Sequence, residues 1–376
     1  MAVRNCSALL LCSAAVWAQA AAPLAYVVNR DDSLVSVVDV ARQRTIRTLP
    51  AGMAMPQEIA ISPDGCLAYL SSVWSATIAV LDLGKQQLLA GIPLNSVGNA
   101  VVFNPSGGLA YVDTPTSSGG AIAVIDTANH QIMRTFVVSP QNTRGMAIHP
   151  DGSRLYALEQ HHPPDAGKVA VVDPVSGTVL ERISVGMDAT DIKVHPAGAY
   201  AYVVNGESRQ AQGSVTVINT RTHTVIATIK VGKHPSRVAF HPAGTPAYVT
   251  NSGDGTVSVI DTARHAVAGS IPVEQAPQHL VFHPDGKHAY VSHPQSDTLS
   301  VIDTMTQQPR GSVTVGSAPW GVAFASDARL ATAKADGSGL EVIAAARARW
   351  PNAAPMVSTI FGDEANVLRA IEAQEL

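Results

Sequence analysis

The chain has 376 residues, of which 46% are hydrophobic and 14% are charged, and its formal net charge at pH 7 is −4. This balance excludes an intrinsically disordered chain, and it argues against nucleic acid as a partner because nucleic-acid-binding proteins need a clustered basic face. Gly and Pro number 29 and 24, while aromatic residues make up only 5% of the chain. With the many Val, Ile and Thr residues, this composition favours short strands joined by turns.

Residues 1–20 have the three parts of a secretory signal peptide. Arg4 supplies the positive start, Ala8–Trp17 is an apolar run, and Ala18–Ala20 is a small-x-small cleavage sequence. The apolar run is too short to cross a bilayer, which needs about 20 residues, and no later segment is long and apolar enough. We therefore expect a mature chain from near Ala21 that has no membrane span and works in the periplasm or outside the cell.

Removal of the signal peptide leaves a single cysteine, Cys66, so that no intrachain disulfide is expected. The sequence contains no C-x-x-C-H motif, which argues against covalently bound c-type haem. The identity of any other cofactor is unknown from the sequence.

A unit of about 42 to 47 residues repeats along the chain. Each copy has a tyrosine in a short apolar strand and an Asp or Asn at the end of the next, alternating strand. The tyrosines are Tyr26, Tyr69, Tyr111, Tyr156, Tyr202, Tyr248 and Tyr290, and the polar residues are Asp39, Asp82, Asp126, Asp173, Asn219, Asp261 and Asp303. The clearest copy predicts four strands, at 237–242, 246–251, 256–262 and 266–273. Four-stranded antiparallel units at this period are typical of propeller blades.

The copies share short sequences: YVTN at 248–251, VSVIDT at 257–262, VGKHPSRVAFHPAG at 231–244, YVVN at 26–29 and 202–205, and YVSH at 290–293. Over residues 24–328 the chain resembles the YVTN family of β-propeller repeats. The resemblance implies an extracytoplasmic propeller, and the family includes surface-layer proteins and accessory proteins near quinone-dependent dehydrogenases. Related propellers include lactonases and haem- or copper-binding enzymes, but none of their catalytic motifs maps onto residues of this chain.

We predict an all-β fold, a propeller with seven blades. Seven inner strands are present, and the chain begins at a second strand, so that Ala25–Leu49 is expected to complete the blade opened by Gly321–Ala325. An eight-bladed ring is the alternative, because 329–346 could form a further strand pair. The predicted organisation is a signal peptide at 1–20, the propeller at 21–348 and a C-terminal extension at 349–376 with a possible short helix.

Two repeated polar positions are predicted to be structural. Four histidines precede a proline at the far end of an inner strand, and we expect them to bond to loop backbone and not to a metal: His149, His195, His241 and His283. The Asp or Asn that ends each third strand is typical of an Asx turn.

The loop that enters each inner strand opens on one face, at the mouth of the central channel. The last two residues of this loop differ between copies, while the surrounding pattern of strands and turns repeats. Function in a repeat protein is expected where the repeat varies. We predict a ligand-binding site, without a metal, formed by Gln57, Glu58, Asn99, Arg144, Asp191, Arg237, Gln278, His279 and Trp320. The alternative is a solvated channel rim. Longer loops at 115–120, 159–165 and 206–213 are expected on the same face.

No linear catalytic motif is present, so catalytic residues are unknown and a non-catalytic protein is favoured. We expect an exported, monomeric binding or scaffold protein that uses one face of the ring for a protein partner or a small polar ligand. The alternative is a propeller enzyme or a cofactor-associated protein, either lactonase-like or accessory to a quinone- or haem-dependent oxidoreductase, with its site at the channel mouth.

Overall fold

The computed structural model describes residues 23–159, 165–206 and 212–325. The predicted signal peptide, the possible strand pair at 329–346 and the C-terminal extension lie outside these residues. The described residues form 28 strands and no helix, and hence no helix that could cross a membrane.

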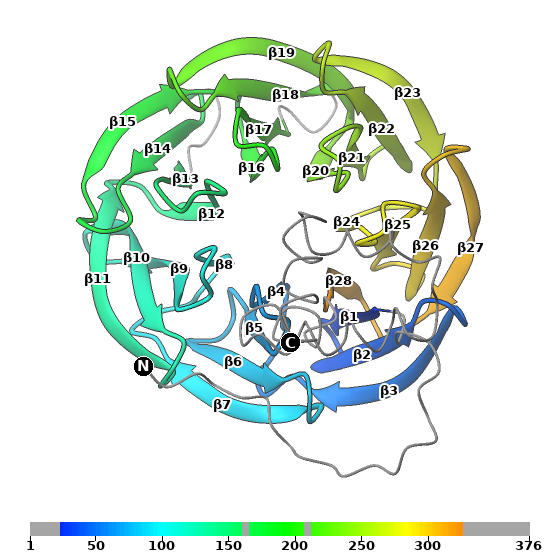
Figure 1. Ribbon diagram of the computed structural model, residues 1–376, viewed down its shortest axis with the longest axis horizontal. Coiled ribbons are helices and arrows are strands. Elements are labelled where there is room, and N and C mark those ends of the chain that lie inside the picture. The colour runs from blue at the N-terminus through cyan, green and yellow to red at the C-terminus, as the bar shows by residue number, and fades with distance from the viewer. Residues whose placement is uncertain (1–22, 160–164, 207–211, 326–376) are drawn as a thin grey trace, which may run out of the picture. The chain divides into compact units, whose positions relative to one another are not determined.

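The strands form seven four-stranded antiparallel sheets, the blades, arranged in a ring (Figure 1). Blade 1 contains β28 (Pro319–Phe324), β1 (Leu24–Asn29), β2 (Leu34–Asp39) and β3 (Arg44–Pro50). Blade 2 contains β4 (Glu58–Ile61), β5 (Leu67–Ser71), β6 (Thr77–Asp82) and β7 (Gln87–Pro93). Blade 3 contains β8 (Val101–Phe103), β9 (Leu109–Thr116), β10 (Gly119–Asp126) and β11 (Gln131–Ser139). Blade 4 contains β12 (Thr143–Ile148), β13 (Leu155–Glu159), β14 (Lys168–Val172) and β15 (Val179–Ser184).

The last three blades follow the same order from the inner to the outer strand. Blade 5 contains β16 (Ala189–Val194), β17 (Tyr200–Asn205), β18 (Gln212–Asn219) and β19 (Thr224–Lys233). Blade 6 contains β20 (Pro235–Phe240), β21 (Ala247–Asn251), β22 (Thr256–Asp261) and β23 (Ala266–Pro272). Blade 7 contains β24 (Leu280–Phe282), β25 (His288–His293), β26 (Thr298–Asp303) and β27 (Gln308–Thr314).

Blade 1 joins the two ends of the repeat region. Its inner strand, β28, pairs antiparallel with β1, with Tyr26 opposite Ala323 and Val27 opposite Val322. The closed ring leaves no open end at which an apolar blade face meets water. The seven-bladed prediction and this closure are confirmed. The segment 329–346, on which the eight-bladed alternative depended, lies outside the described residues.

The strands between the inner and outer edges of each blade are buried on both faces. The repeated tyrosines are at most 3% exposed, and they pack in apolar clusters that join neighbouring blades. In one such cluster, Tyr248 and Val259 of blade 6 contact Leu280 and Phe282 of blade 7. Because each blade covers the next, a strand such as β22 is buried along most of its length, including Ser258.

Three of the four repeated histidines link neighbouring blades on the face opposite the predicted mouth. The ring Nε2 atoms of His149, His195 and His241 lie 2.9 to 3.0 Å from the carbonyl oxygen of a turn glycine in the next blade. For His195 this glycine is Gly244, and the imidazole also packs against Phe240 with ring centroids 5.2 Å apart. His283 accepts the backbone N–H of Asp285 in its own turn at 3.3 Å, so the prediction that the four histidines bond to loop backbone is confirmed.

His195→Ala should destabilise the ring, because it removes both a hydrogen bond and an aromatic contact between two blades. We expect a loss of about 1 to 2 kcal/mol in the free energy of unfolding, measured by urea titration. Arg221→Ala, in an exposed turn, is the control and should change it by less than about 0.5 kcal/mol. Equal stability of the two variants would show that the histidine links are not structural.

The Asp or Asn at the end of each third strand forms the predicted Asx turn. Asp261 Oδ1, for example, accepts the backbone N–H groups of Ala263 and Arg264 at 2.9 and 3.2 Å. The other six make the same kind of contact: Asp39, Asp82, Asp126, Asp173, Asn219 and Asp303. These residues are therefore structural in all seven blades.

Candidate functional site at the channel mouth

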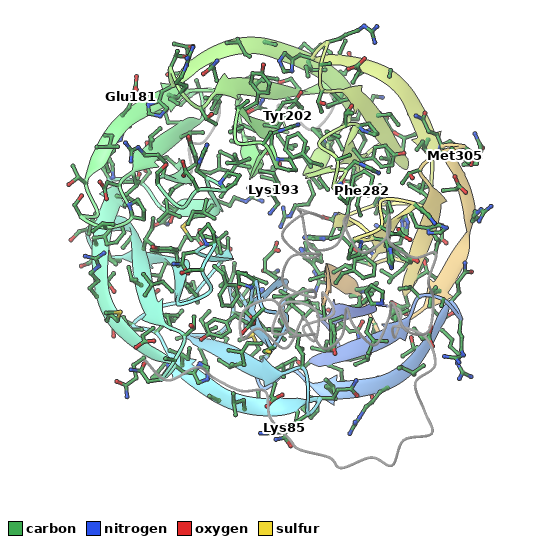
Figure 2. All side chains as sticks on the ribbon, in the orientation of Figure 1. Lys85, Glu181, Lys193, Tyr202, Phe282 and Met305 are labelled. Carbon is green, nitrogen blue, oxygen red and sulfur yellow. The ribbon has the colours of Figure 1, made fainter. Side chains whose placement is uncertain are left out.

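The inner strands surround a cavity of about 790 Å³. Figure 2 shows Lys193 at the inner edge of the ring, whereas Lys85, Glu181 and Met305 lie on its outer circumference. All nine residues predicted for the site line this one cavity: Gln57, Glu58, Asn99, Arg144, Asp191, Arg237, Gln278, His279 and Trp320. Their convergence follows from their equivalent positions at the starts of seven inner strands.

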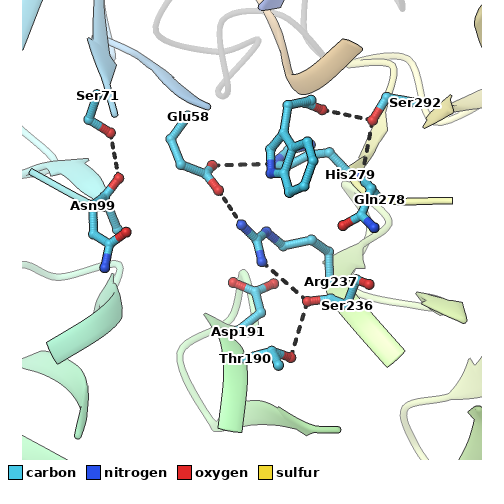
Figure 3. A network of polar contacts seen from close by, with 12 residues as sticks. Glu58, Ser71, Asn99, Thr190, Asp191, Ser236, Arg237, Gln278, His279 and Ser292 are labelled. Carbon is cyan, nitrogen blue, oxygen red and sulfur yellow. Dashed lines mark hydrogen bonds and ion pairs between the residues drawn. The ribbon is translucent and has the colours of Figure 1, made fainter. Parts of the chain in front are cut away.

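An ion pair crosses the cavity. Glu58 at the start of β4 in blade 2 accepts a hydrogen bond from the Arg237 guanidinium on β20 in blade 6. The two blades are not neighbours in the ring, so the side chains meet across the channel (Figure 3). His279 from blade 7 joins them, with its Nε2 atom 3.7 Å from Glu58 Oε2.

Burial and mutual charge set the ionisation of this cluster. Burial raises the pKa of Glu58, but the nearby Arg237, His279 and Lys193 and the hydrogen bond from Arg237 together outweigh it and hold the pKa below its usual range. Burial depresses the pKa of Arg237, but the Glu58 and Asp191 carboxylates together more than compensate and raise it. Burial lowers the pKa of His279 to about 4, against the opposing effect of Glu58. At neutral pH the cluster therefore contains a carboxylate, a guanidinium and a neutral imidazole.

A second pair of charges lies on blade 5. Asp191 Oδ2 accepts the backbone N–H of Val238 in blade 6 at 3.0 Å, so that this carboxylate also links two blades. Its Oδ1 atom is 3.9 Å from the Lys193 ammonium, and the Lys193 side chain is 45% exposed. Lys193 was not predicted for the site, although strand alternation places it on the same face as Asp191, two residues away. It adds a solvent-accessible cation to the cavity.

Two of the predicted residues have partners of their own. The Arg30 guanidinium lies 4.9 Å from the centre of the Trp320 ring, a cation–π contact. Arg144 approaches Asp188 at 3.4 Å, with both side chains nearly half exposed. These contacts orient the aromatic ring and the second arginine without placing either in the central cluster.

Among the described residues, no group of three His, Cys, Asp or Glu side chains could hold a metal ion. In the central cluster, His279 faces one carboxylate and a guanidinium. The Glu58–Arg237 pair and the nearby Asp191 and Lys193 give the described part of the cavity groups for hydrogen bonding and ion pairing.

Comparison with known proteins agrees with this architecture. A family model for YNCE-like β-propellers matches residues 236–347, and one for the choice-of-anchor I domain matches residues 144–276. Together with the seven blades, the first match supports a β-propeller of YVTN type.

Several solved structures resemble this propeller in fold. Kuenenia stuttgartiensis hydrazine synthase has a TM-score of 0.68 at 23% identity, covering 74% of this chain and 92% of that chain. A functionally unknown protein from Desulfotomaculum acetoxidans DSM 771 has a TM-score of 0.68 at 16% identity, covering 80% of this chain and 98% of that chain. Dihydro-heme d1 dehydrogenase NirN, in complex with DHE, has a TM-score of 0.61 at 16% identity, covering 83% of this chain and 77% of that chain. No curated protein sequence matches the chain.

A set of polar residues two positions after the repeated tyrosine was not predicted from the sequence. Ser71, Thr250 and Ser292 each donate a hydrogen bond from the hydroxyl to a mouth-residue carbonyl in the next blade. Those carbonyls belong to the predicted residues Asn99, Gln278 and Trp320, respectively. A polar residue inside an otherwise apolar strand was the available signal. The backbone of the mouth is thus positioned by neighbouring blades.

One of the expected mouth loops is not a loop. Residues 115–120 were predicted as a long connection, but β9 continues to Thr116 and β10 starts at Gly119, so only Ser117 and Ser118 form the turn. Cross-strand pairing of Pro115 with Gly120 extends the hairpin. The prediction was wrong because a Pro-, Ser- and Gly-rich sequence also suits an extended two-residue hairpin. The expected loops at 159–165 and 206–213 lie largely outside the described residues.

Proposed function

We propose that this protein is an exported, non-catalytic binding protein that holds a small polar ligand at the channel mouth. The observation that carries the proposal is the convergence of nine variable mouth residues on one charged cavity. Concave sites with a few convergent polar groups are the usual places for small ligands. Export to the periplasm or the cell exterior rests on the signal sequence of residues 1–20.

The charges of the cavity indicate how such a ligand would be held. Glu58 and Arg237 satisfy each other across the channel, while Lys193 has only a distant contact with Asp191. A ligand with both acidic and basic or hydrogen-bonding groups can replace these contacts without leaving a charge unpaired. A purely apolar ligand would bury the charges at a large cost.

The proposal predicts that protein purified from its own cells retains a small molecule, which mass spectrometry under non-denaturing conditions detects. The double variant Glu58→Gln with Arg237→Gln removes both charges and leaves neither partner unpaired. We expect it to retain at least about tenfold less of that molecule, because charged hydrogen bonds contribute about 1.5 to 3 kcal/mol each. Arg221→Ala, in an exposed turn, is the control and should retain as much as the wild type.

Failure to find a bound molecule in the wild-type protein, or equal retention by the double variant, would contradict the proposal. If the same face instead binds a protein partner, the ligand is a polar segment of that partner and the small-molecule part of the proposal is wrong.

A second candidate is a cofactor-associated protein, and one observation favours it. The His279 imidazole is neutral at the cavity wall and chemically able to ligate a haem iron or a metal. Two of the structures with a similar fold are named as hydrazine synthase and as a haem d1 dehydrogenase, although at this identity the likeness concerns the fold alone. Against this candidate, the Glu58–Arg237 pair spans the cavity. An absorption spectrum with a haem or quinone band that is lost in His279→Gln would favour the cofactor.

A further inference from the structure

In blades 6 and 7, the hydroxyl group two positions after the repeated tyrosine makes two hydrogen bonds at once. Thr250 Oγ1 accepts the backbone N–H of Arg237 in its own blade at 3.1 Å and donates to the Gln278 carbonyl in the next blade at 2.9 Å. Ser292 Oγ likewise accepts the N–H of His279 at 3.1 Å and donates to the Trp320 carbonyl at 2.7 Å. In these two blades one hydroxyl is both acceptor and donor where the blade meets the next, whereas the equivalent residue in blades 1, 4 and 5 is apolar: Val28, Leu158 and Val204.

Blade 3 has Asp113 at this position, on β9, and its residue exposure is 0%. Asp113 Oδ1 accepts the backbone N–H of Ala100, which is the equivalent of Arg237 and His279 in the other blades. Asp113 Oδ2 is buried and has no hydrogen-bond partner among the described residues. Strand β9 packs against β12 of blade 4, where Arg144 is the equivalent of Gln278 and Trp320. Asp113 therefore accepts the same backbone hydrogen bond as Thr250 and Ser292 do. The bond that it lacks is the one that those hydroxyls donate to a carbonyl of the next blade.

An ionised carboxylate cannot complete that bond, because it would place a second acceptor opposite a carbonyl oxygen. A neutral carboxylic acid has the required O–H and matches the hydroxyls of blades 2, 6 and 7. We propose that Asp113 is held as a neutral acid that donates to the Arg144 carbonyl, and that loss of this proton opens the seam between blades 3 and 4.

The surroundings of Asp113 favour the neutral form. Burial raises the pKa of Asp113 to about 7, against the opposing Ala100 N–H, and the negative charge of Glu58 on β4 raises it further. On β12, the Arg144 guanidinium is directed to Asp188, whose carboxylate lies 3.4 Å away. Because Arg144 lies at the mouth, deprotonation of Asp113 would loosen one edge of the candidate site.

The sign of the pH effect follows from proton binding. The ordinary pKa of an Asp carboxyl is 3.8, so between about pH 4 and pH 7 the folded chain keeps a proton that the unfolded chain has released. The seam's contribution is complete at the acidic end of this window and is lost as the pH rises toward 7.

Asp113→Asn tests the proposal, because an amide can accept from Ala100 and donate to the Arg144 carbonyl at every pH. Urea titrations from pH 4.5 to pH 8 give the unfolding constants of the wild type and the variant. We expect the ratio of wild-type to variant constants to rise with pH, by up to tenfold per pH unit for one proton, and to level off above about pH 7. Asp113→Ser, with the hydroxyl found in blades 2 and 7, should give the same pH-dependent ratio.

A ratio that is constant across this pH range would overturn the proposal, as would one that falls as the pH rises. The carboxyl carbon of Asp113 in selectively labelled wild-type protein provides a second measurement that does not depend on the stability of a variant. Its chemical shift should titrate near pH 7, and titration near pH 4 would equally overturn the proposal.

Discussion

Val259→Asp is expected to prevent the propeller from folding. Val259 on β22 is 1% exposed and packs with Tyr248, Leu280 and Phe282 between blades 6 and 7. A carboxylate placed there has no partner and costs several kcal/mol, which is a large part of the roughly 5 to 15 kcal/mol that stabilises a typical domain. Far-ultraviolet circular dichroism and urea titration measure the outcome.

Val267→Asp is the matched control, because Val267 lies on the outer strand of the same blade and is 43% exposed. It should change the free energy of unfolding by less than about 0.5 kcal/mol. If Val259→Asp folds as stably as this control, the interface between blades 6 and 7 is not the apolar core described above.

Arg237→Met should be the most destabilising single change at the channel mouth. It leaves the Glu58 carboxylate without its counter-charge in a site where both side chains are about four-fifths buried. Breaking a fully buried pair costs about 3 to 5 kcal/mol, and partial exposure reduces the expected loss here to about 1 to 3 kcal/mol. Urea titration at two salt concentrations measures it, and the loss should change little with salt.

Adding Glu58→Gln to Arg237→Met should recover part of that loss, so that the two changes are non-additive by about 1 kcal/mol or more. Arg144→Met is the control, since its contact with Asp188 is nearly half exposed and should contribute little. Strict additivity of the Glu58 and Arg237 changes would mean that the charges do not interact across the channel.

The fold could be predicted almost completely because its signals are local and occur in seven copies. Strand alternation, turn residues and the Asp or Asn after each third strand depend on neighbours in sequence. Even the ring closure followed from a simple count, because the chain begins at a second strand and the last inner strand lacked a partner. The predicted loop at 115–120 failed where one composition suits both a loop and a tight hairpin.

The candidate site could be predicted only as positions on a circle. Alignment of the repeats placed Glu58 and Arg237 at equivalent points, but which side chains meet across a channel depends on ring diameter and rotamers, which no linear pattern records. The role of Asp113 was missed for a related reason. The role of the Asp113 side chain can be inferred only by comparing its contacts with those of Thr250 and Ser292 in other blades.

The central claim is that the mouth is the binding face, and equilibrium titration of the molecule released from the wild-type protein tests it most directly. Binding should weaken at least about tenfold in Trp320→Ala and in the Glu58→Gln, Arg237→Gln double variant, since Trp and Arg are favoured anchors. It should be unchanged in His241→Ala, which alters the opposite face. Binding that survives the mouth variants but is lost in His241→Ala would contradict the account.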